Sequence, residues 1–132
     1  MKVSDAGWRV YYLEGRLIRI IRGLKSVPGA ETALDVMRAA SDVVSHAIDI
    51  FDHERVSSEP QASMRVADML RQARLSDAVR LVEGLGTDTP DSREVTDLRM
   101  CLTELDELTA FFGEEWPQGL QSGHQGLDVA QV

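Results

Sequence analysis

The sequence has few of the features that cross-link a protein or hold it in a membrane. Its 132 residues include one cysteine, Cys101, which excludes an intramolecular disulfide and a cysteine-based zinc site. The first seven residues lack the apolar segment of a signal peptide, and no stretch approaches the ~18 apolar residues that cross a membrane. We therefore expect a cytoplasmic protein that is not inserted in a membrane.

Strand patterns are also lacking. No segment combines two-residue alternation with β-branched enrichment and hairpin turns. Apolar residues instead recur at three- and four-residue steps, which predicts helices over residues 8–25, 31–52, 60–74, 76–85 and 91–112. We expect an all-α fold of about five helices in antiparallel hairpins. Residues 1–112 would form the single domain, and 113–132, which lose the period, a flexible tail.

The charge is unevenly distributed. Twenty-two acidic against 14 basic residues give a net charge of −8, which argues against nucleic acid as the main partner. Residues 1–25 nevertheless carry +4, which leaves −12 for residues 26–132. We expect the basic first helix to dock on the acidic body rather than on a membrane or a nucleic acid.

The junction of the third and fourth predicted helices has a familiar pattern. Its residues Gln72-Ala73-Arg74-Leu75-Ser76-Asp77-Ala78 resemble the corner of a tetratricopeptide (TPR) hairpin, where an alanine lets two helices approach closely. Pro90 follows Ala78 by the twelve residues at which such repeats place their terminal proline. The pattern predicts that residues 61–90 form an antiparallel helical hairpin. Val66, Arg65 and Ala62 depart from the consensus small residue, leucine and tryptophan.

Those departures match a narrower group. The chain resembles the small TPR-type co-chaperones of bacterial type III secretion needle subunits, in which an arginine and a large aliphatic residue also replace the consensus leucine and glycine. The resemblance spans about Val44–Leu108 and is carried by Ser45-His46-Ala47-Ile48, Met64-Arg65-Val66-Ala67-Asp68-Met69-Leu70 and Asp77-Ala78. It implies a cytosolic protein that holds a small helical secretion subunit until export, usually with a second small chaperone. For related proteins of plant-associated bacteria, the resemblance implies that a small regulator is sequestered instead.

A TPR hairpin uses one edge of its first helix for the partner helix and the next edge for a concave binding surface. When the third predicted helix is aligned with the first helix of a TPR hairpin, its second edge predicts a partner-binding groove. Its residues would be Met64, Ala67, Leu70 and Arg71, continued by Cys101 and Leu105 on the fifth helix. The alternative left open is that these side chains form core against the first two helices.

Catalytic and metal chemistry find little support in the sequence. Four metal-ligand types share one face of the second helix, Asp42, His46, Asp49 and His53, but no other helix supplies an obvious further ligand. Cys101 has no basic neighbour in sequence, so we expect a buried, inert thiol. No pair of carboxylates is set up for acid-base work. We therefore expect no enzyme activity, no cofactor and no metal.

The leading hypothesis is a type III secretion co-chaperone that binds an amphipathic helix of a needle or regulatory subunit in an apolar groove. One alternative is a generic TPR-like adaptor that binds a peptide carboxylate, for which Arg71 is the basic group available. Another is an acidic inhibitor of a nucleic-acid-binding protein, suggested by the charge of −8. Steep salt dependence would distinguish the last from apolar binding.

Overall fold

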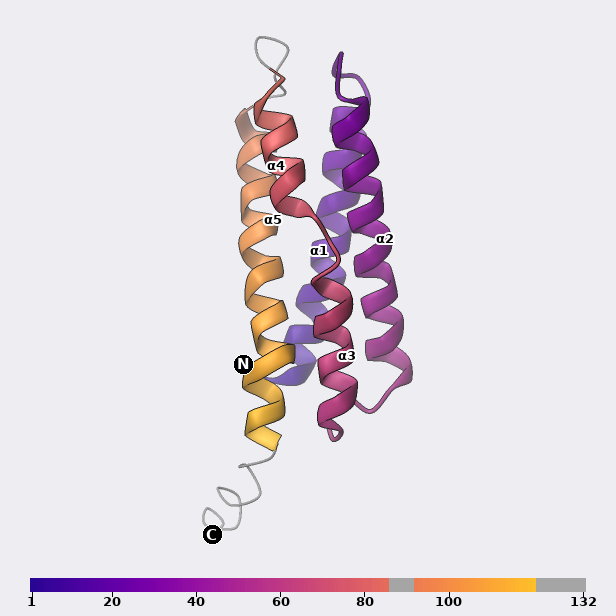
Figure 1. Cartoon of the computed structure of the whole chain (residues 1–132), viewed down its shortest axis with the longest axis vertical. Coiled ribbons are helices and arrows are strands. Elements are labelled where there is room, and N and C mark those ends of the chain that lie inside the picture. The colour runs from indigo at the N-terminus through magenta and orange to yellow at the C-terminus, as the bar shows by residue number, and fades with distance from the viewer. Residues whose placement is uncertain (86–91, 121–132) are drawn as a thin grey trace.

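Four antiparallel helical rods make up the bundle shown in Figure 1. The computed structural model describes residues 1–85 and 92–120, and all regular structure in these two ranges is helical. The all-α prediction is confirmed. In chain order the rods run up, down, up and down, which is the topology that short connections favour. The elements are α1 (Val3–Leu24), α2 (Glu31–His53), α3 (Pro60–Leu70), α4 (Leu75–Glu83), α5 (Ser92–Ala110) and η2 (Phe111–Glu115).

The third rod is interrupted. Figure 1 shows α3 and α4 following each other in the same direction, separated by residues 71–74. Both lie against α2 and α5, and they make little or no contact with each other. The predicted antiparallel hairpin of these two helices is therefore wrong. Pro90, the residue predicted to end it, lies outside the described residues.

Burial explains why the bundle replaces the hairpin. α3 buries Ala62, Val66 and Leu70, and α4 buries Leu75, Ala78, Val79 and Val82. These two apolar stripes continue one another along the same side of the bundle. Placed end to end, both stripes reach one core that every helix shares. If α3 and α4 folded back on each other, each would be covered only by the two or three turns of the other helix. That arrangement buries less apolar surface.

The turns and helix starts follow local chemistry. Gly29 has a positive φ of 78°, which ends the α1–α2 connection after Pro28. Pro60 occupies the first turn of α3, where its missing N–H leaves no helical bond unmade. α1 begins at Val3, five residues before the predicted start, because Ala6 and Gly7 already face the core.

The fourth rod contains a π-helical turn just before Pro117. Proline has no backbone N–H, so Pro117 cannot donate a hydrogen bond to a carbonyl of the preceding helical turn. The Trp116 N–H bonds the Phe111 carbonyl, five residues back, and the Phe112 carbonyl instead accepts a 2.6 Å hydrogen bond from the buried hydroxyl of Ser63. A single turn of π-helix thus ties α3 to the end of α5.

Residues 113–120 correct the predicted tail. They continue the helix beyond α5, although the sequence predicted loss of structure from Gly113. Trp116 stacks on Phe111 at 5.9 Å between ring centroids, and its indole Nε1 donates to the Val56 carbonyl at 2.8 Å. These contacts supply the ordering that the local composition lacks. Residues 121–132 lie outside the described part of the chain.

The basic first helix docks on the acidic body, as expected. The Arg9 guanidinium donates to Glu104 and to Glu107 of α5, with its Nη2 at 2.6 Å from an oxygen of each. The pKa of the Glu104 carboxyl is lowered by this hydrogen bond. Across the described ranges, no helix is long and apolar enough to span a membrane.

Candidate protein-binding site

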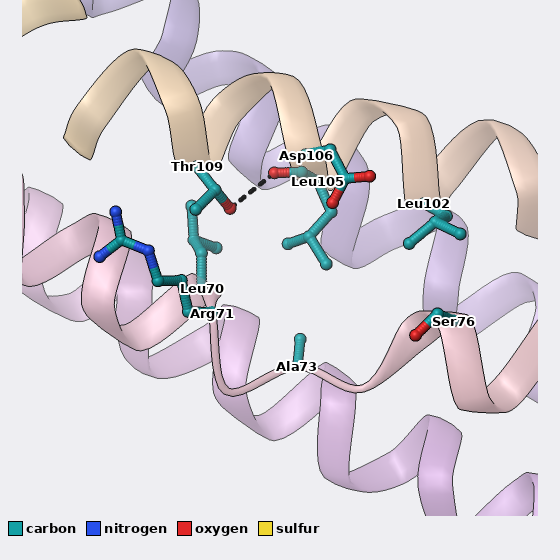
Figure 2. Close-up of a pocket in the computed structure, with 8 residues that line it drawn as sticks. All are labelled: Leu70, Arg71, Ala73, Ser76, Leu102, Leu105, Asp106 and Thr109. Carbon is teal, nitrogen blue, oxygen red and sulfur yellow. Dashed lines mark hydrogen bonds between the residues drawn. The ribbon is translucent and has the colours of Figure 1, made fainter. Parts of the chain in front are cut away.

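A notch opens where the third rod is interrupted. Its volume is about 340 Å³. Figure 2 shows it between the 71–74 linker and α5. The α3–α4 notch, as we call it, is lined by Leu70, Arg71, Ala73, Ser76, Leu102, Leu105, Asp106 and Thr109.

The backbone of the linker creates the notch. The N–H groups of Gln72 and Ala73 bond carbonyls only three residues back, which tightens and then ends α3. Helix resumes at Leu75, whose fully buried side chain anchors the new start in the core. Of the four intervening residues, Arg71 and Ala73 line the notch, and the small methyl group of Ala73 leaves space toward α5. A continuous helix would have placed a further turn of side chains in this space.

The floor of the notch is apolar. Leu70 from α3 and Leu105 from α5 are buried, and Leu102 and Ala73 are partly exposed. In Figure 2 the three leucine side chains turn toward the hollow from its two sides, with Ala73 on the linker beneath. An apolar side chain entering here would lose its water and gain contacts on several sides.

The rim is polar, but much of its hydrogen-bonding capacity is already used. The Thr109 hydroxyl donates to the Leu105 carbonyl of its own helix at 2.7 Å. The Arg71 guanidinium donates to the Asp68 carboxylate at 2.5 Å and extends away from the hollow in Figure 2. Ser76 and Asp106 are exposed at the mouth. This arrangement favours an apolar guest over a carboxylate.

Three of the six predicted groove residues meet at the notch: Leu70, Arg71 and Leu105. The other three do not. Ala67 is fully buried against Gly113 of η2. The two residues lie so close that a Cβ added to Gly113 would be 3.1 Å from the methyl group of Ala67. Met64 is 46% exposed, but it is not part of the notch. Two of the four residues predicted for this edge, Ala67 and Leu70, face the bundle interior, because α5 and η2 cover the side that a TPR hairpin leaves open.

Cys101 is part of the core. Its side chain is fully buried, and burial raises the pKa of its thiol to about 11 although the Arg16 charge acts in the opposite direction. A thiol in this state is neither a nucleophile at neutral pH nor a contact for a partner. The burial of Cys101 agrees with the inert role expected from sequence and removes it from the binding surface.

The candidate metal face of α2 carries exposed side chains. Asp42, His46, Asp49 and His53 are all exposed, and the His53 Nδ1 lies 2.8 Å from the Asp49 carbonyl of its own helix. Nowhere in residues 1–85 and 92–120 do three or more metal-ligating side chains gather as a group that could hold an ion.

An aromatic surface on α1 was not predicted from the sequence. Trp8 and Tyr12 are 64% and 69% exposed, and the Trp8 ring lies 5.9 Å from Tyr11 and 6.5 Å from Tyr12. A hollow of about 530 Å³ opens beside them, with Phe51 of α2 in its wall. The signal was present in the sequence, since Trp8 and Tyr12 fall off the three- and four-residue steps of the buried stripe. Large aromatic residues out of phase with a core stripe indicate an interaction surface.

Comparisons of the chain with protein-family models, with curated proteins and with solved structures each found no match.

Proposed function

We propose that the chain is a non-catalytic helical bundle that binds a partner protein by accepting an apolar side chain in the α3–α4 notch. The observation that carries this proposal is a hollow at a backbone break, in which the partly exposed Leu102 lies beside the buried Leu70 and Leu105. Its volume of 340 Å³ is at the lower end of the range for ligand pockets, about 300–1,000 Å³. One or two side chains of an amphipathic helix would occupy it.

The lining chemistry supports binding rather than catalysis. The notch contains no histidine, cysteine or lysine, and its charged side chains, Arg71 and Asp106, are exposed. Exposed charges in contact with water supply little of the pKa tuning that acid-base catalysis uses. Because Arg71 already pairs with Asp68, the adaptor alternative, in which Arg71 binds a peptide carboxylate, has less support than apolar capture.

The resemblance to type III secretion co-chaperones supplies the first partner to test, a small helical secretion or regulatory subunit. Such a subunit would present an amphipathic helix whose apolar face requires cover in the cytoplasm. The proposed role is to hold that face. The TPR hairpin is not needed for it, since the notch offers a different apolar surface for the same purpose.

Two aspartate substitutions on α5 test the site. Leu102→Asp places a charge in the notch, whereas Met100→Asp places one on the exposed part of the same helix, where the methionine is 52% exposed. Each variant is co-expressed with small helical proteins encoded by neighbouring genes, and co-purification is measured. We expect Leu102→Asp to lose the partner and Met100→Asp to retain it, with little change on adding salt.

Equal co-purification by both variants, each with unchanged helical circular dichroism, would show that the notch is not the binding site. Leu70→Asp is unsuitable for this comparison. Leu70 is fully buried, so a charge there would unfold the bundle rather than report on binding.

A further inference from the structure

α1 has a second, outward-facing stripe. Its buried face holds the aliphatic residues expected of a core helix, but four of the large apolar side chains exposed in the described chain also belong to α1: Trp8, Tyr11, Tyr12 and Ile18. They include both tyrosines and one of the two tryptophans of the protein. Tryptophan and tyrosine concentrated on an exposed face are typical of protein interfaces.

The outer residues follow one line along the helix. We call this line the outer stripe: Asp5, Trp8, Tyr12, Gly15, Arg19 and Arg22. Their steps of three and four residues keep all six on the side of α1 opposite the core, and all six are exposed. This is the spacing by which one helix lies against another along its whole length.

Gly15 has no role inside the bundle. A Cβ added at Gly7 would collide with the Phe51 ring, and one at Gly23 would displace the carboxylate of Glu94, so both of those glycines lie against neighbours in the fold. A Cβ added at Gly15 would meet nothing within 4 Å. A mid-helix glycine opposes helix formation, and here it leaves a gap in the outer stripe that a large side chain from outside can fill.

The charges of the outer stripe also lack partners within the fold. Seven other arginines of the described chain form ion pairs with carboxylates. Arg19 and Arg22 form none with any described residue, and neither does Asp5 at the other end of the stripe. None of the described carboxylates therefore pairs with these two arginines, which lie three residues apart on one helix face.

We propose that the outer stripe of α1 binds the outer stripe of a second copy of this chain, with the two helices antiparallel. In the register that aligns the three- and four-residue steps, every feature of the stripe meets its complement. Tyr12 lies over Gly15 of the second copy, so a large ring fills the gap left by a glycine. Trp8 lies against Arg19 of the second copy, a cation–π pair, and Asp5 lies against Arg22, an ion pair.

Two-fold symmetry repeats each of these contacts, since a surface of this kind is self-complementary. The same register brings Ile18 of the second copy beside Tyr11, at the edge of the 530 Å³ hollow. The hollow is preformed on one side, because the Phe51 ring packs directly on the α1 backbone at Gly7. The Tyr11 hydroxyl donates to the Asp52 carboxylate, which holds the phenol ring in place.

The stripe favours a second copy over an anionic membrane. Aromatic and basic residues on one helix face also suit lipid headgroups. However, the protein carries −8 overall, and the carboxylates of Asp5 and Asp52 lie beside the aromatic rings. Anionic lipid would repel these groups, whereas a second copy pairs Asp5 with an arginine.

Sedimentation equilibrium of the full chain over a wide concentration range tests the proposal. We expect a reversible monomer–dimer equilibrium. Arg22→Asp should weaken it at least about tenfold by placing two aspartates opposite each other, and the double variant Asp5→Arg, Arg22→Asp should restore it. Gly15→Leu should also weaken it, since leucine would occupy the space of the Tyr12 ring. Arg55→Asp, a reversal at another exposed arginine without an ion pair, is the control and should leave the equilibrium unchanged.

The proposal fails if the wild type is monomeric at all concentrations, if Arg22→Asp dimerises as well as the wild type, or if the double variant is no better than the single one. Binding of a monomeric wild type to vesicles of anionic lipid, lost in Arg22→Asp, would instead assign the stripe to membranes. The notch is tested separately, because Leu102→Asp should leave the dimer intact and Arg22→Asp should leave notch binding intact.

Discussion

Ser63 shows how one hydroxyl compensates for one proline. Among the residues that the structure describes, it is the buried polar side chain of the core, and its hydroxyl donates to the Phe112 carbonyl. That carbonyl needs an outside donor because Pro117 offers none. The serine therefore belongs to the π-helical turn as much as to α3.

We predict that Ser63→Ala lowers the free energy of unfolding by about 1–3 kcal/mol, since it leaves a buried carbonyl without a donor. Chemical denaturation followed by circular dichroism measures the change. Ser58→Ala, on an exposed serine of the α2–α3 connection, is the matched control and should change stability by less than about 0.5 kcal/mol. Equal effects of the two substitutions would contradict the assigned hydrogen bond.

Cys101 gives a second prediction at the residue scale. Because burial raises its thiol pKa to about 11, the thiolate is scarce at pH 8 and the sulfur is shielded from reagents. We expect modification by a disulfide reagent at pH 8 to be slow in the native protein and fast in guanidinium chloride. A native rate close to that of the unfolded chain would place Cys101 at the surface, contrary to the structure.

At the scale of elements, α1 separates what a helix needs for its own fold from what it presents outward. Gly7 and Gly15 illustrate the difference. At Gly7 the Phe51 ring occupies the space of a side chain, with its Cζ 2.3 Å from an added Cβ. At Gly15 the space is open. The same residue type thus has a packing role at one position and none at the other.

This contrast predicts opposite signs for one substitution on one helix. Gly15→Ala should raise the free energy of unfolding by up to about 1 kcal/mol, since alanine favours the helix and meets no neighbour. Gly7→Ala should lower it, because Phe51 must move from its contact with Phe112. Thermal melts of dilute protein, where monomers dominate, measure both. If Gly7→Ala instead stabilised the protein, the Phe51 ring would be able to leave its contact with Phe112 at little cost in free energy.

α3 and α4 show the limit of local patterns for an element pair. Neither glycine nor proline marks residues 71–74, and the corner motif is compatible with a hairpin or with a break in a rod. The outcome depends on which surface covers the apolar stripes. Here α2 and α5 cover both, so the chain continues in the same direction after the break.

For the whole molecule, the end of the fourth rod matters more than composition suggests. Residues 113–120 close one end of the bundle through Trp116, which reaches from the last helix to the carbonyl of Val56 in the α2–α3 connection. The Gly113 backbone passes close to α3, and an added Cβ there would lie 2.6 Å from the Arg71 guanidinium.

A pair of truncations tests this closure. A chain ending at residue 112 should be less stable than one ending at residue 120 by at least about 2 kcal/mol, because it loses the Trp116 ring contact and hydrogen bond. Urea unfolding compares the two. If both chains unfold at the same urea concentration, the segment does not contribute to the fold. Trp116→Ala in the full chain should reproduce most of the difference.

The sequence by itself determined the fold class and most of the helix positions. Each follows from the spacing of apolar residues along a few turns, which is a local property. It also predicted that the basic first helix docks on the acidic body, from the opposite net charges of residues 1–25 and 26–132. The ordering of residues 113–120 escaped prediction because it depends on contacts with residues about 50 to 60 positions away, Ser63 and Val56.

Only the tertiary structure decided whether the apolar side chains along α3 and α5 line a groove or a core. Ala67, Leu70 and Leu105 have the same spacing whether they line a groove or a core, and α5 settles the matter by covering α3. The notch exists because four residues of linker leave space between two packed helices, and no sequence period encodes such a space. The exposed stripe of α1 likewise became visible once the buried face was known, because exposure is a property of the packed bundle and not of the helix.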